Sequence, residues 1–145
     1  MLKSVLISSC AVLTLSMAGC ATMSNPSTER NLNDLQNKNW VVSELYGTKL
    51  AADPTQSDVP SIQFNNERVS GSDGCNRFMG GYAVKGTQIQ FSNLASTQRA
   101  CLNATDIPQK YTQALGQVTH YDASKKELKF LDANNKVVIK FDHVK

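Results

Sequence analysis

Two cysteines lie in segments crowded with turn-forming residues, and they carry the strongest chemical signal in this chain of 145 residues. The first segment, from Gly71 to Tyr82, reads GSDGCNRFMGGY, and the second, from Ser96 to Cys101, reads STQRAC. Glycine permits tight turns and close backbone approach, and Ser, Asp and Asn side chains bond backbone groups in such turns. The first segment therefore predicts a structured turn, either a fold-defining corner or a binding loop on a rigid scaffold. We call its centre the motif loop, which consists of Gly74, Cys75, Asn76, Arg77 and Phe78.

No combination of titratable residues has the spacing of a catalytic or metal site. His120 and His143 lie far apart, and neither has ligand spacing to a cysteine. The carboxylates Glu67, Asp73 and Asp106 lie where turns and helix caps need acidic residues anyway. The chain also has no nucleophile elbow and no phosphate-binding glycine loop. We therefore expect a protein that is not an enzyme and that uses no cofactor and no metal.

The N-terminus has the pattern of a secretory signal. Lys3 provides a positive charge, residues 5–15 are mostly apolar, and small residues precede Cys20. The run LSMAGC also resembles a bacterial lipobox, in which the signal is cut before the cysteine and that cysteine receives lipid. We therefore expect residues 1–19 to be a lipoprotein signal peptide and Cys20 to be lipidated. The alternative is an ordinary signal peptide that is cut just after Cys20.

The rest of the chain is long enough for one domain. We expect a lipidated cysteine and flexible tether over residues 20–33, and a folded domain over residues 34–145. Ala21 follows the lipid site and fits sorting to the outer membrane, with the domain facing the periplasm or, as an alternative, the cell surface. The formal charge of +3 falls to +2 without Lys3, and no basic run is present. We expect a monomer that contacts the membrane through its lipid and does not bind nucleic acid.

Compartment and cysteine count together suggest a disulfide. Cys10 would leave with the signal and Cys20 would carry the lipid, so that Cys75 and Cys101 remain in an oxidising environment. We expect these two residues to form a disulfide. Two separate free thiols are the alternative, because the sequence does not give the distance between them.

Hydrophobic periodicity predicts a mainly β fold with one main helix. Apolar residues recur every three or four positions from Ala104 to Val118, which indicates a helix, and Pro108 suits its first turn. Elsewhere short alternating segments are separated by turn residues, as in antiparallel hairpins. We expect a meandering antiparallel sheet that curls into a small barrel, with an open sheet under the helix as the alternative. The expected strands are 40–46, 61–64, 68–71, 82–85, 88–91, 119–121, 127–131 and 136–142.

The motif residues resemble a known family. Gly74 to Phe78, the Gly81-Tyr82 step, Ser96-Thr97 and Ala100-Cys101 are similar to the META domain of HslJ-like bacterial heat-shock proteins. The resemblance covers residues from about 34 to 143. It implies a small β-rich domain with a helix in a secreted or lipid-anchored protein, with links to heat shock and novobiocin tolerance and, in distant relatives, to secretion or motility. It does not imply a reaction.

Three functions follow from these observations. The first is a lipid-anchored stress- or drug-tolerance-related protein that binds an envelope protein or another envelope component. The second is a carrier of an apolar ligand inside the barrel, lined by Phe64, Ile89, Phe91 and Phe130, although these residues would equally well form a filled core. The third is a secretion-pilot-like lipoprotein that captures a partner's tail through a groove or sheet edge.

Overall fold

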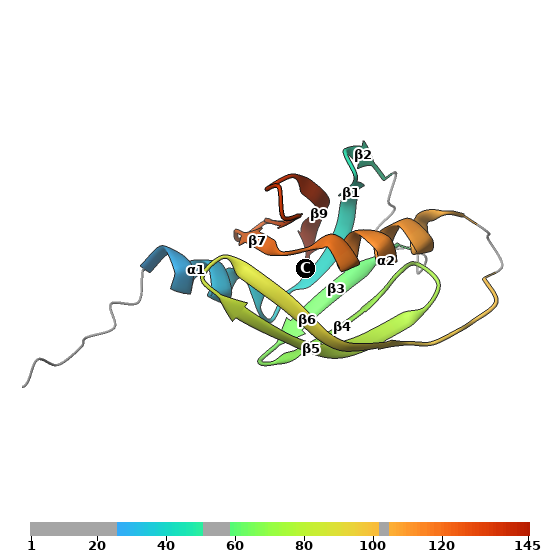
Figure 1. Ribbon diagram of the computed structural model, residues 1–145, viewed down its shortest axis with the longest axis horizontal. Coiled ribbons are helices and arrows are strands. Elements are labelled where there is room, and N and C mark those ends of the chain that lie inside the picture. Colours follow the sequence, from blue (N-terminus) through green and yellow to red (C-terminus); the bar gives the residue numbers. More distant parts are fainter. Residues whose placement is uncertain (1–25, 51–58, 102–104) are drawn as a thin grey trace, which may run out of the picture.

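The computed structural model describes residues 26–50, 59–101 and 105–145 of the chain. The expected signal peptide and the lipid site at Cys20 lie outside the described residues. The described chain forms two helices and nine strands, arranged as a curled sheet (Figure 1). None of the helices in these residues is both long and apolar enough to cross a membrane.

The sheet is antiparallel throughout and closes on itself. Its strand order is β2-β1-β3-β4-β5-β6-β7-β8-β9, and a further pairing between β1 and β9 completes the ring. The predicted barrel-like fold is therefore confirmed, with nine strands and two helices. The strands are β1 (Asn39–Leu45), β2 (Thr48–Lys49), β3 (Ser61–Asn65), β4 (Arg68–Ser72), β5 (Arg77–Lys85), β6 (Gln88–Ser96), β7 (His120–Ala123), β8 (Glu127–Leu131) and β9 (Val137–Val144).

The hairpin turns follow from residues that tolerate a left-handed backbone. Asn66 links β3 to β4 with φ of 48°, and Asn135 precedes β9 with φ of 59°. Gly86 links β5 to β6 with φ of 63°, a conformation that costs glycine nothing. These tight turns place consecutive strands side by side, and the alternating side chains then fill the barrel.

The interior of the barrel is a packed cluster of aromatic rings. Phe64 contacts Tyr82, Phe91 and Phe130, with ring centroids 4.9, 6.3 and 6.2 Å apart. Phe130 in turn contacts Phe141 at 5.0 Å. These edge-to-face and stacked contacts are the arrangements that aromatic rings favour in cores. Three of the four residues expected to line a ligand cavity, Phe64, Phe91 and Phe130, therefore contact one another, and the fourth, Ile89, is buried in the same core.

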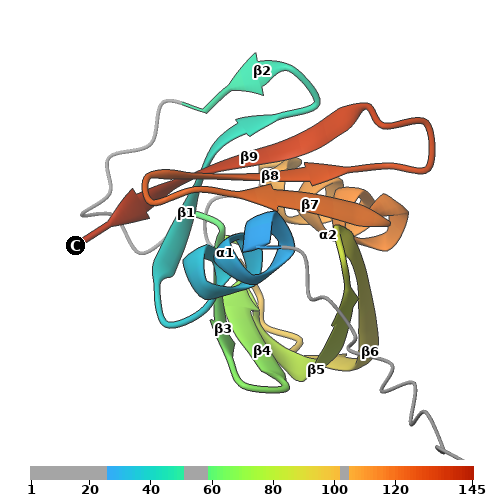
Figure 2. The same cartoon turned by 90° about the vertical axis from the view of Figure 1, so that its left-hand side faces the viewer.

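The second helix, α2 (Ile107–Gln117), lies where β6 and β7 diverge (Figure 2). Its buried residues are Tyr111, Ala114 and Leu115, on the face that the periodicity predicts. Asp106 occupies the N-cap position, although its side chain makes no capping hydrogen bond. Its carboxylate instead pairs with Lys110 one turn later, with 2.7 Å between oxygen and nitrogen.

The first helix corrects the expected tether. Residues 26–33, assigned to a flexible tether from the sequence, belong to α1 (Pro26–Leu35), which lies across one end of the barrel (Figure 2). Leu35 is fully buried, and the Asn31 side chain accepts a hydrogen bond of 2.6 Å from the backbone N–H of Ala123. Trp40 Nε1 donates to the carbonyl of Leu35 at 2.9 Å. These tertiary contacts stabilise a helix that has too few apolar residues to be recognised by periodicity.

The seam between β6 and β7 is the weakest join in the ring. The two strands share a single residue pair, Gln88 with His120. Backbone bonds from Ile89 N to Thr119 O and from Tyr121 N to Thr87 O support that pair. Beyond it the strands separate, and no other strand of the described residues pairs with that edge of β6.

Candidate functional site

The motif loop is organised around the buried carboxylate of Asp73. Its Oδ1 accepts hydrogen bonds from the backbone N–H groups of Cys75 and Asn76, at 2.8 and 2.6 Å. Ser72 Oγ accepts a third, from the N–H of Gly74, which has φ of 97°. A carboxylate that accepts backbone N–H groups holds a turn more strongly than a neutral acceptor does. Asp73 is therefore the acceptor that shapes the loop.

Asn76 ties the motif loop to the second cysteine segment. Its Oδ1 accepts the backbone N–H of Arg99 at 2.8 Å. Thr97 completes the connection, because its Oγ1 accepts the N–H of Arg77 at 3.1 Å and its own N–H donates to the Arg77 carbonyl at 2.9 Å. The sequence predicts a disulfide between these two segments, but not the hydrogen bonds that Asn76 and Thr97 form between them.

A disulfide joins the same two segments. Cys75 and Cys101 are bonded in the structure, with their Cα atoms 5.8 Å apart and 26 positions between them in the sequence. On the inner side of the loop, the buried Phe78 ring contacts Tyr111 of α2, with centroids 6.1 Å apart. Burial, with a smaller contribution from Asp73, raises the pKa of Tyr111 well above its ordinary value.

The motif residues therefore chiefly stabilise the turn between β4 and β5 and its contact with the second cysteine segment. The polar side chains of Asp73 and Asn76 bond backbone groups, Cys75 is in the disulfide, and Phe78 is buried. Arg77 is exposed on the outer face of β5. This arrangement has the features of the fold-defining corner rather than of a reactive centre.

The other candidate residues for chemistry are not brought together. His120 Nδ1 lies 2.8 Å from the hydroxyl of Thr119, and the His143 ring contacts Trp40 at 5.8 Å. Asp106 is exposed, and its hydrogen bond with Lys110 lowers the pKa of its carboxyl. Within the described ranges, no three His, Cys, Asp or Glu residues are grouped closely enough to hold a metal ion.

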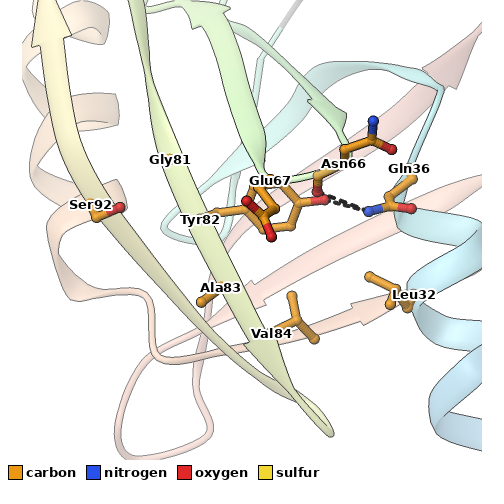
Figure 3. A pocket seen from close by; sticks show the side chains of 9 residues that line it. All are labelled: Leu32, Gln36, Asn66, Glu67, Gly81, Tyr82, Ala83, Val84 and Ser92. Carbon is orange, nitrogen blue, oxygen red and sulfur yellow. Dashed lines mark hydrogen bonds between the residues drawn. The ribbon is translucent and has the colours of Figure 1, made fainter.

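An open depression of about 560 Å³ lies beside α1 (Figure 3). On one side Gln36 Nε2 donates to the hydroxyl of Tyr82 at 2.6 Å, and burial is the main cause that raises the pKa of that phenol. On the other side Leu32 and Val84 form an apolar wall (Figure 3). The depression is a surface feature, because the Tyr82 ring packs against Phe64 beneath it.

The free edge of β6 is the feature that the sequence reasoning missed. Every residue from Ser92 to Ser96 is exposed, and Leu94 has 42% of its surface accessible. On the neighbouring strand Met79 is 63% exposed. The strand reads QIQFSNLAS, with no charged residue and no proline to protect its edge. A bulge beside Gly80 interrupts its pairing with β5. The lack of charge was visible in the sequence, but the loss of the neighbouring strand was not.

Comparison with known families agrees with the fold and with the motif. The model of the META domain matches residues 33–145. The chain belongs to the META domain family. The match begins within α1 and includes all nine strands, both cysteines of the disulfide and the motif loop. Among curated proteins, none matches this META domain chain.

Solved structures share the fold at low sequence identity. An NMR structure of a protein from Burkholderia xenovorans is 21% identical, covers 98% of this chain and 99% of its own, and has a TM-score of 0.64. A second NMR structure is 21% identical over 76% of this chain and 92% of its own, with a TM-score of 0.60. A DUF4847 family protein from Bacteroides vulgatus is 17% identical over 77% and 95%, with a TM-score of 0.54. These similarities concern the fold alone.

Proposed function

We propose that this META domain protein is a lipid-anchored binding protein of the bacterial cell envelope, that it is not an enzyme, and that it contributes to stress or drug tolerance by holding a protein partner. The observation that carries the proposal is the edge of β6 beyond Gln88, which has no charged residue and with which no other described strand pairs. An exposed strand edge offers backbone N–H and C=O groups to an extended segment of another chain, which can add as a further strand. Natural proteins usually protect such an edge with charges, proline or a covering element.

The geometry of β6 supports this mode of binding. The N–H of Ile89 points away from β5 toward Thr119, and backbone direction alternates along a strand. The N–H and C=O groups of Phe91 therefore face the same side as those of Ile89, after β7 has diverged. Leu94 and Met79 add exposed apolar surface beside this edge. Backbone groups would supply affinity, and the apolar side chains would supply selectivity.

A carrier of apolar ligands has less support. Phe64, Phe91 and Phe130 contact one another inside the barrel, so that the side chains that would line a cavity fill it instead. The depression beside α1 opens to the surface and has polar groups on one side. Capture of a partner segment at the β6 edge requires no internal cavity. The exposed surface of β6 therefore favours capture of a partner segment over transport of an apolar ligand.

Crosslinking from the edge tests the binding proposal. A photoreactive amino acid at Ala95, on the exposed part of β6, should give a discrete crosslinked product in cells that produce the full chain. The same group at Gln63, an exposed position on the central strand β3, is the matched control and should give none. Ser96→Pro removes a backbone N–H on the free side of β6 and should abolish the product, because proline cannot donate to a ladder. Equal crosslinking from both positions, or from neither, would contradict edge binding.

The lipid anchor is tested separately at Cys20. The expected result for wild-type protein is recovery with the membrane fraction, because several acyl chains bind the bilayer at about 0.8 kcal/mol per buried CH₂. Cys20→Ser should move the protein to the soluble periplasmic fraction and remove the acyl mass from the mature chain. Cys10→Ser, in the expected signal peptide, is the control and should change neither property. Membrane retention of the Cys20→Ser protein would contradict lipidation.

A further inference from the structure

The barrel side of the β6 edge is apolar. Phe91 on β6 lies opposite the buried Tyr82 on β5, so both side chains lie on the barrel side of the sheet. Leu94 lies on the same side, because a Cβ added to Gly80, which faces that side two positions before Tyr82, would lie 2.8 Å from Leu94 Cδ2. Phe91 is half-buried and Leu94 is exposed. Every second side chain of a strand added along this edge would contact these two residues, and apolar side chains fit there.

The bulge in β6 decides which backbone groups this edge offers to a partner. Before the bulge, the N–H of Ile89 points away from β5. After it, the N–H of Thr97 points toward β5 and donates to the carbonyl of Arg77 at 2.9 Å. Because backbone direction alternates along a strand, the N–H and C=O groups of Ser96 point away from β5. The free edge therefore extends as far as Ser96, next to Arg77.

Two exposed cations flank the Ser96 end of this edge. The backbone of Arg77 is bonded to Thr97 through both its N–H and its carbonyl, and Arg99 follows two positions after Thr97. Neither arginine side chain forms an ion pair within the part of the chain that the structure describes. The bonds that hold these two residues in the fold use their backbone groups, so both guanidinium groups are available to a partner.

No acidic residue compensates these cations along the edge. The chain from Arg77 to Cys101, which includes all of β5 and β6, also contains Lys85 but no Asp or Glu. On the other side of the seam, α2 presents Lys110, which is already paired with Asp106 at 2.7 Å. The nearby carboxylate of Asp73 is buried and accepts backbone N–H groups. The edge is thus complementary to a negatively charged segment, whereas β6 of a second copy would bring further cations and no acid.

We propose that the β6 edge captures an extended segment of a partner protein in which acidic and apolar residues alternate. Its carboxylates pair with Arg77 and Arg99, and its apolar side chains pack on Phe91 and Leu94. The inference rests on the proposed function, which supplies capture at this edge, and it names the chemistry of the captured segment. Two strand spacings, roughly 10 Å, separate the backbone of β5 from that of an added strand, and an arginine and a glutamate that reach toward each other span this distance. A guanidinium can bind a carboxylate through two parallel hydrogen bonds.

Three fluorescent peptides test this chemistry. Each has the length of β6, 9 residues, and alternates valine with glutamate, glutamine or lysine. Fluorescence anisotropy measures the Kd of each peptide for the mature protein, purified from cells that produce the full chain. We expect the glutamate peptide to bind about fivefold more tightly than the glutamine peptide, as two exposed ion pairs would give, and the lysine peptide to bind most weakly. This preference should disappear at about 1 M salt, where the Debye length falls to about 3 Å.

Substitutions locate the effect on the molecule. Arg77→Gln combined with Arg99→Gln should remove the preference for the glutamate peptide. Lys125→Gln combined with Lys126→Gln is the matched control, because it removes the same charge from exposed positions in the β7–β8 turn, and it should leave the preference unchanged. A photoreactive amino acid at Ala95 should crosslink to the glutamate peptide, whereas the same group at Gln63 should not.

The other outcomes separate this inference from the proposed function. Three peptides that bind equally and crosslink at Ala95 would overturn the acidic preference and leave edge capture intact. Equal loss of the preference in both double variants would do the same, because net charge would then be its cause. A dimer that Ser96→Pro converts to a monomer would make a second copy the occupant and would also overturn the inference.

Failure of all three peptides to bind has two readings that the crosslink in cells distinguishes. If Ala95 still gives a discrete product in cells, the alternating acidic pattern is wrong and edge capture stands. If Ala95 gives no product in cells either, the proposed function itself is contradicted, and the inference with it.

Discussion

Gly71→Ala should destabilise the domain by about 3 kcal/mol or more, because a β-carbon at this position has no space. Gly71 lies in β4, between Ile62 on β3 and Phe78 on β5. A Cβ added there would overlap the backbone carbonyl oxygen of Ser61 and would lie 2.6 Å from Cζ of Phe78. The carbonyl belongs to the sheet and cannot rotate away, and the Phe78 ring is buried against Tyr111. The strands would have to separate, or the ring would have to leave the core.

Thermal unfolding measured by circular dichroism gives the readout. For a domain of this size, a loss of about 3 kcal/mol corresponds to a fall in Tm of roughly 10 °C or more. Gly116→Ala is the matched control, since it adds the same methyl group in α2, where nothing lies within 4 Å of the new carbon. Alanine has the higher helix propensity by about 1 kcal/mol, so that variant should melt at the same temperature or slightly higher. Similar melting temperatures for the two variants would show that the sheet can accommodate a β-carbon at position 71 without loss of stability.

The barrel could be predicted because the strands alternate and the turns have specific chemistry. Ile62 and Phe64 are both buried on β3, as their alternation requires, and Asn66 takes the left-handed conformation of the turn that follows. The prediction is wrong where the alternation breaks. The alternation of Val137, Ile139 and Phe141 predicts that Val137 faces inward. In the structure Val138 is the buried residue instead, because the pairing of β8 with β9 shifts beside Leu131. A bulge reverses the side-chain direction with no change in composition, so periodicity alone does not reveal it.

The candidate site could be predicted only in part. The segment from Gly71 to Tyr82 was recognisable as a turn, since its glycines permit tight turns and its short polar residues bond neighbouring backbone groups. The hydrogen bonds of the motif loop to Thr97 and Arg99 depend on a contact between segments twenty or more positions apart. Helix α1 was not predicted for the same reason, because a contact that stabilises it, between Asn31 and the backbone of Ala123, joins residues 92 positions apart. The divergence of β6 from β7 is likewise a property of the closed sheet, and it creates the edge on which the proposed function depends.

Reduction of the disulfide should lower the Tm of the domain by roughly 10 °C or more. The bond between Cys75 and Cys101 spans 26 positions. Closing a loop of this length removes about 3.5 kcal/mol of unfolded-chain entropy on the chain-entropy model. The hydrogen bonds of Asn76 to Arg99 and Thr97 do not depend on the disulfide, so we expect them to connect the two segments in the reduced folded protein as well. Melting curves with and without a reducing agent measure the effect directly.

Two variants separate the bond from the residues around it. Cys75→Ser and Cys101→Ser should each melt at the temperature of reduced wild-type protein, and neither should respond to the reducing agent. Asn76→Ala keeps the disulfide and removes the acceptor for the Arg99 N–H, so it should lower the Tm of both oxidised and reduced protein. If the disulfide and the Asn76 bonds fix the same contact, combining Cys75→Ser with Asn76→Ala should cost more than the sum of the two changes, because neither constraint then remains. Wild-type protein that melts at one temperature in both redox states would show that the hydrogen bonds alone hold the motif loop to the second cysteine segment.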